Sequence, residues 1–155
     1  MWSRQMTKVI KIPKYTELPA GGYYLDQAVQ YVNSILVSAG VEEITFHMVK
    51  NYIKIGIVPS PEEKLYYREH IASILFVAVA KMILPLERMT VLKKIEEAKE
   101  QKETWYNYFA TEFENGLEHK IKEHSIQDDK EKFISDLICA VIRKMELLQY
   151  IEEIE

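Results

Sequence analysis

The stretch TFHMVKNYIKIGIVP, residues 45–59, decides the expected fold. Thr45 can accept a hydrogen bond from a free backbone N–H at a helix start, and Gly56 can end the helix in the left-handed conformation. Between them, apolar side chains recur at steps of three and four residues, which is the spacing of one helix face. The sequence therefore predicts a short amphipathic helix over residues 45–55, with Val49, Tyr52 and Ile53 turned inward.

The opposite face of this predicted helix is polar. It carries His47, Lys50, Asn51 and Lys54. On an isolated amphipathic helix such a face is ordinary solvated surface. In a helix-turn-helix the second helix enters the DNA major groove, where Asn51 can pair with an adenine edge and Lys50 with guanine or phosphate. In that context we favour DNA contact.

The segments on either side complete the expected fold. Upstream, apolar residues at helical spacing predict a helix from Asp26, as the N-cap, to a stop at Gly40. Downstream, two β-prone runs flank Pro59 and Pro61, which predicts a β-hairpin over residues 57–67. A strongly apolar helix over residues 68–83 follows. This order predicts an all-α protein with a small β-hairpin wing: a winged helix-turn-helix followed by a helical extension.

Three regions are expected along the 155 residues. Residues 1–23 form an extended N-terminal arm, residues 24–90 the DNA-reading unit, and residues 91–155 a helical extension for dimerisation or effector binding. The wing would add phosphate contacts to those of the second helix. The complete set of expected DNA-binding residues is Thr45, His47, Lys50, Asn51, Lys54, Lys64, Tyr66 and Arg68.

Residues 45–59 resemble the recognition helix and wing start of the MerR family. The resemblance implies a winged helix-turn-helix in which a base and aromatic residues precede a glycine, two aliphatic residues and a proline. A wider likeness covers residues 24–29, 48–54 and 59–66, which are similar to a bacterial family called domain of unknown function 1836. It spans roughly residues 20–100 and implies a regulator of transcription with no established ligand.

Charge is unevenly distributed along the chain, whose net charge is −4. Residues 1–90 carry 10 Lys and Arg against 8 Asp and Glu, and residues 91–155 carry 10 against 16. The first fourteen residues contain only cations, Arg4, Lys8, Lys11 and Lys14, which would suit an arm along a DNA backbone or a solubilising tail. The positive half therefore coincides with the expected DNA reader, and the negative half with the expected assembly region.

In the extension, Trp105, Tyr108 and Phe109 belong to an aromatic stripe. Such a stripe forms a ligand pocket or, as we favour, packs against the last helix or a dimer mate. Residues 134–148 add a heptad seam about two heptads long, which is short for an autonomous coiled coil. The resemblance to regulators that pair through the helices after the wing implies a homodimer. No motif supports an enzyme, a cofactor or a metal site, and a small-molecule effector has no motif of its own.

The remaining expectations concern location and function. The start of the chain lacks the pattern of a signal peptide, and the longest apolar stretch, residues 71–79, is too short to cross a membrane, so we expect a cytoplasmic protein. The leading hypothesis is a DNA-binding regulator of transcription. Because Glu62 and Glu63 would make the wing unfavourable for phosphate, the alternative is a protein-interaction module on the same scaffold that does not bind DNA.

Overall fold

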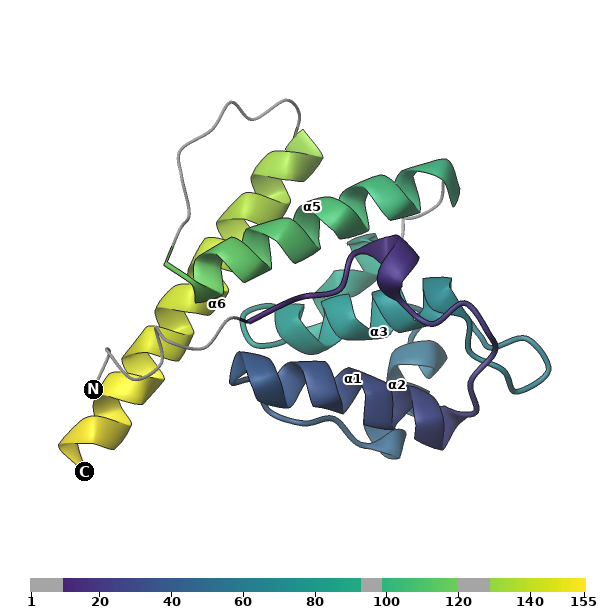
Figure 1. Ribbon diagram of the computed structural model, residues 1–155, viewed down its shortest axis with the longest axis horizontal. Helices are drawn as coiled ribbons and strands as arrows, with labels where there is room; N and C mark the ends of the chain where they lie inside the picture. Colours follow the sequence, from purple (N-terminus) through teal and green to yellow (C-terminus); the bar gives the residue numbers. More distant parts are fainter. Residues whose placement is uncertain (1–9, 93–98, 120–128) are drawn as a thin grey trace.

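The computed structural model describes residues 10–92, 99–119 and 129–155, and within them it is built from helices and turns (Figure 1). The helices are α1 (Leu25–Ala39), α2 (Phe46–Lys54), α3 (Arg68–Ala80), α5 (Lys99–Leu117) and α6 (Asp129–Ile154). Two 3₁₀ segments, Tyr15–Glu17 and Leu86–Leu92, precede α1 and follow α3. No helix in these described ranges is long and apolar enough to span a lipid bilayer.

Helix α3 forms the centre of the molecule. Every residue from 71 to 80 is buried, so the helix is covered on all sides. Helix α1 packs on one side of it, and α5 and α6, which also pack on each other, cover the other (Figure 1). Phe76 of α3 meets Trp105 and Phe109 of α5 edge to face, with ring centroids 5.0 and 5.1 Å apart. The core is therefore continuous between α3 and the C-terminal helices α5 and α6.

The segment before α1 lies on this body. Ile12 and Leu18 are each only 1% exposed. The segment is fastened to α5 by three hydrogen bonds: the Ile12 N–H donates to Glu114 Oε1 (2.8 Å), the Tyr15 N–H donates to Asn107 Oδ1 (2.7 Å), and the Tyr106 hydroxyl donates to the Pro13 carbonyl (2.9 Å). Residues 10–18 are thus a strap across α5, while Arg4 and Lys8 lie outside the described residues.

The predicted β-hairpin wing over residues 57–67 is wrong. The described ranges contain no β-strand, only two isolated bridges, Glu62 with Leu65 and Tyr23 with Tyr66. The first run cannot form a ladder, because the N–H groups of Ile57 and Val58 donate to the Tyr52 carbonyl at the end of α2, and prolines at 59 and 61 have no N–H to give. The second run pairs elsewhere: Tyr66 exchanges both of its backbone hydrogen bonds with Tyr23 (2.8 and 2.7 Å).

A single tight turn stands where the wing was expected. Glu62 and Leu65 exchange two backbone hydrogen bonds, of 3.0 and 2.8 Å, around Glu63 and Lys64. Both central residues have positive φ, 50° and 70°, which is the geometry of a two-residue type I′ turn. The fold is therefore all-helical with a turn in place of a wing.

Candidate nucleic-acid interface

Helix α2 lies as the sequence predicted. Thr45 is its N-cap, and its side-chain hydroxyl accepts a hydrogen bond from the Met48 N–H (3.2 Å). Val49 and Tyr52 are 0% and 1% exposed, facing the core. The helix ends at Lys54, and two residues later Gly56 has a φ of 84°, a conformation that glycine adopts without strain. These contacts fix which side of a nine-residue helix faces water.

The outward face of α2 brings together four of the predicted residues. His47, Lys50, Asn51 and Lys54 are all exposed. Helical spacing places them on one side, because steps of three, four and seven residues return to the same face. The helix contains no acidic residue, so this face carries positive charge and an amide. It can offer hydrogen-bond donors to phosphates and base edges.

Asn33 of α1 holds the connection between α1 and α2, a role that the apolar periodicity did not reveal. Its Nδ2 donates to the Ile44 carbonyl (3.0 Å), and its Oδ1 accepts from the Ile44 N–H (2.8 Å). At the start of this connection Gly40, with φ of 81°, lets the Val41 N–H donate to the Leu36 carbonyl (2.8 Å). The one available signal was an asparagine inside a helix, where its intrinsic propensity is poor.

Lys81 is a second residue that the sequence reasoning missed. It follows α3, and its Nζ lies 5.9 Å from the centroid of the Tyr52 ring and 4.0 Å from Met48 Sδ. Burial lowers the pKa of Lys81, and nearby Glu42 works in the opposite direction. The cation thus supports the inner side of α2 and does not belong to its exposed face.

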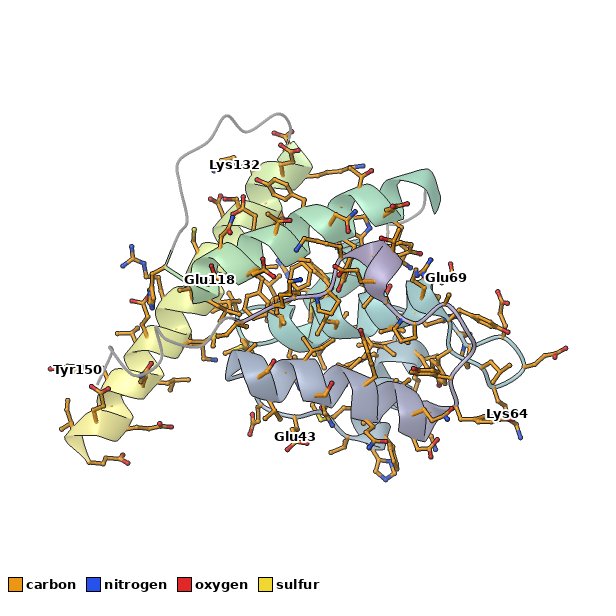
Figure 2. The ribbon with its side chains drawn as sticks, viewed as in Figure 1. Glu43, Lys64, Glu69, Glu118, Lys132 and Tyr150 are labelled. Atoms are coloured by element: carbon orange, nitrogen blue, oxygen red, sulfur yellow. The ribbon has the colours of Figure 1, made fainter. Side chains whose placement is uncertain are left out.

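The three residues predicted for the wing are not equivalent. Lys64 is exposed at the tip of the Glu62–Leu65 turn, where Figure 2 shows it at the end of the molecule opposite to Tyr150 of α6. Tyr66 is 5% exposed, and its ring packs edge to face on His70 at 5.8 Å. Arg68 donates to the carbonyls of Leu18 and Thr16, at 3.1 Å each. Of the three, only Lys64 faces solvent with its charged group.

The cations of the N-terminal segment also differ. Lys11 is exposed. Lys14 is half-buried, with its Nζ 3.9 Å from Glu114 Oε1 and 3.3 Å from the Ile12 carbonyl. Among the described members of this group, Lys11 is therefore better placed than Lys14 to meet an external anion.

The predicted aromatic stripe lies on α5 and is largely buried within the protein. Trp105 and Phe109 are buried at 6% and 0% exposure against α3. Tyr108 is half-buried, and its pKa is raised by burial and by a hydrogen bond to Glu112. The Trp105 and Phe109 rings thus contribute to the core between α5 and α3.

Comparisons with known proteins identify a family for this chain, but they find no similar curated protein or solved structure. A family model, described as "Domain of unknown function (DUF1836)", matches residues 13–110, which include α1, α2, α3 and the first part of α5. Because this match covers more than half of the 155 residues, the chain belongs to the family of domain of unknown function 1836.

Proposed function

We propose that the protein is a DNA-binding regulator of transcription that reads duplex DNA through the exposed face of α2. The observation that carries the proposal is this face: His47, Lys50, Asn51 and Lys54, exposed together on a helix that contains no acid. Asn51 is the candidate for an adenine edge, and Lys50 for guanine or phosphate. The likeness of residues 45–59 to the MerR recognition helix supports the same function, without the wing of that family.

The residues around α2 favour DNA contact because they hold this helix in place and put another cation beside it. Asn33 and the Thr45 cap hold the helix rigidly, and rigid placement is what base recognition needs. Lys64 at the neighbouring turn would add a phosphate contact, which Glu62 and Glu63 weaken. Arg68 is less available than Lys64 to an external phosphate, because its Nε and Nη2 donate to the carbonyls of Leu18 and Thr16.

The test is a titration of the full chain against random duplex DNA at increasing salt. We expect the logarithm of the binding constant to fall linearly with the logarithm of the salt concentration. The double variant Lys50→Ala/Lys54→Ala should bind at least about tenfold more weakly, because each phosphate contact contributes to the salt-dependent affinity. The matched control is Arg88→Ala/Lys132→Ala, which removes the same charge from exposed positions outside α2. Absence of binding at low salt, or an equal loss in the control, contradicts the proposal.

The proposed reader acts as a homodimer that pairs through the end of α6. Leu147, Tyr150, Ile151 and Ile154 are between 51% and 68% exposed. They lie on the side of the helix opposite to Val141 and Met145, since two residues turn an α-helix by about 200°. Figure 2 shows Tyr150 pointing away from the body. Two α2 helices at a fixed spacing would bind DNA more tightly than one, because the second contact is intramolecular.

Charge favours an antiparallel pairing of these helix ends. Arg143 precedes the apolar face, and Glu152, Glu153 and Glu155 follow or border it. An antiparallel pair places each arginine beside the acidic end of its mate, whereas a parallel pair places acids against acids. Light scattering at tens of micromolar should give a dimer for the natural chain and for Val37→Glu, and a monomer for Leu147→Glu/Ile151→Glu. A monomeric natural chain contradicts the pairing.

A protein-interaction module remains the second candidate, and one feature favours it. Phe46 and Val37 are 49% and 58% exposed and line a shallow groove between α1 and the start of α2, bordered by Asp26 and Glu43. An apolar surface with acidic edges suits a basic, apolar protein segment. The same DNA titration separates the candidates, because the interaction module predicts no DNA binding even at low salt.

A further inference from the structure

A cavity of about 420 Å³ lies between the end of α1, the end of α5 and the last part of α6. The apolar part of its wall is made of aliphatic and thioether side chains, among them Val37, Met82, Leu117, Ile142 and Met145, and the polar part includes Ser38 and Gln149. Gly116 also lines it and contributes no side chain, which leaves room. A volume of this size falls within the range of small-molecule sites, roughly 300–1,000 Å³.

The electrostatics of the cavity favour a cation. Glu146 and Glu152 of α6 line it together with His119, and no lysine or arginine does among the residues that the structure describes. Helix α1 ends at Ala39 and α5 ends at Leu117, and both residues lie in the cavity wall. The last turn of a helix carries a partial negative charge on its carbonyl groups. Two carboxylates and the ends of two helices therefore border one partly apolar cavity.

We propose that this cavity binds an alkylammonium ion, a ligand with an aliphatic tail and a primary ammonium head. The tail would contact Val37, Met82 and Leu117, and the flexible thioethers can adapt to its shape. The head has three N–H donors, which suit the carboxylates of Glu146 and Glu152. No phenylalanine, tyrosine or tryptophan lines the cavity in the described part of the chain, so an aliphatic cation fits better than one that needs an aromatic cage. This site is distinct from the α2 face and does not depend on DNA binding.

The test uses three probes that share one tail: octylammonium, octyl sulfate and octyl glucoside, each below its micelle concentration. Isothermal titration of the full chain at pH 7 should detect binding of octylammonium, which is fully protonated at that pH because alkylamines have a pKa near 10.4. The anion and the neutral glycoside should bind at least about fivefold more weakly. Ser38→Leu, at an exposed position of the lining, should block the cavity without disturbing the core.

Charge variants locate the site. Glu146→Gln and Glu152→Gln should each weaken octylammonium binding about fivefold, as expected for the loss of one partly screened charge. Glu153→Gln is the matched control, because it removes the same charge from an exposed residue of α6 outside the lining. Equal binding of the three probes, no binding of any of them, or an equal effect of the control overturns the proposal. Binding that appears only in Leu147→Glu/Ile151→Glu assigns the cavity to a second copy of the chain and also overturns it.

Discussion

At the scale of single residues, Asn33 has the largest expected effect outside the apolar core. Its side chain makes both hydrogen bonds to Ile44, and the residue is half-buried. Asn33→Ala leaves the N–H and the carbonyl of Ile44 without these partners, so we expect the free energy of unfolding to fall by about 2 kcal/mol. Urea denaturation measures this loss, and DNA affinity should fall in parallel if α2 is the reader.

Gln30→Ala is the control for this prediction. Gln30 lies one turn earlier in α1 and is exposed, so its loss should change stability by less than about 0.5 kcal/mol. Equal effects of the two substitutions would show that the contacts of Asn33 with Ile44 do not stabilise the connection.

The hydroxyl group of Tyr52 is expected to destabilise the folded protein. The ring is 1% exposed, and the hydroxyl is buried with no hydrogen-bond partner among the described residues. A buried polar group without a partner keeps its desolvation penalty. Tyr52→Phe should therefore raise the free energy of unfolding by about 1 kcal/mol at pH 7. A decrease in the urea midpoint would contradict this account.

The same residue gives the protein a pH dependence at the alkaline end. Burial raises the pKa of Tyr52 to about 12, from about 10 in the unfolded chain. Below pH 10 the hydroxyl is neutral in both states, so its ionisation does not change the free energy of unfolding. Between pH 10 and 12 the unfolded chain ionises first, so the free energy of unfolding falls as pH rises. Tyr52→Phe should lose less stability than the natural chain over this interval.

Which individual residues face solvent was only partly predictable from the sequence. Helical periodicity placed Lys50 and Lys54 on the outer face of α2 because the inward positions of that helix are apolar. Helical periodicity could not predict the surroundings of Arg68, because its hydrogen bonds go to Leu18 and Thr16, about fifty residues earlier in the chain. Long-range contacts of this kind depend on the tertiary fold, so no local pattern indicates them.

At the scale of elements, the Glu62–Leu65 turn is built from residues that suit it poorly. Glu63 and Lys64 both have positive φ, a conformation that costs non-glycine residues about 1 kcal/mol or more each. The substitution Glu63→Asn/Lys64→Gly supplies the preferred pair for this turn type, so we expect a gain of about 1 kcal/mol by thermal or urea denaturation. Pro at position 64 in place of Gly should have the opposite effect, because proline requires negative φ.

The helices were more predictable than the hairpin for a physical reason. Thr45, Gly40 and Gly56 act within four or five residues of their own position, so they mark helix ends in the sequence itself. A β-strand needs a pairing partner elsewhere in the chain. Tyr66 pairs with Tyr23 and not with the β-prone residues before Pro59. The start of α1 shows a smaller error, since the N-cap is Tyr24 instead of Asp26 and its N–H donates to Gln27 Oε1 (2.9 Å).

At the scale of the whole molecule, the uneven distribution of charge along the chain corresponds to two surfaces, the exposed face of α2 and the end of α6. The cations of the first 90 residues include the exposed face of α2, and the excess acids of residues 91–155 include those at the end of α6. Periodicity predicted helices in the extension, but it could not say which surface they cover. In the structure α5 covers α3, so the extension completes the core of the helices that precede it.

The part of the chain that contains α1, α2 and α3 is therefore not expected to fold by itself. Residues 71–80 of α3 are all buried in the full chain, and part of their cover comes from Trp105 and Phe109. A fragment of residues 1–92 would expose that face of Phe76 and lose the hydrogen bonds from the N-terminal strap to α5. Apolar surface left uncovered in this way destabilises a small fold and promotes association. We expect no cooperative thermal transition for the fragment by circular dichroism, and a single one for the full chain. A fragment that unfolds cooperatively as a monomer would show instead that α5 and α6 are a separate unit, and that α2 is positioned without them.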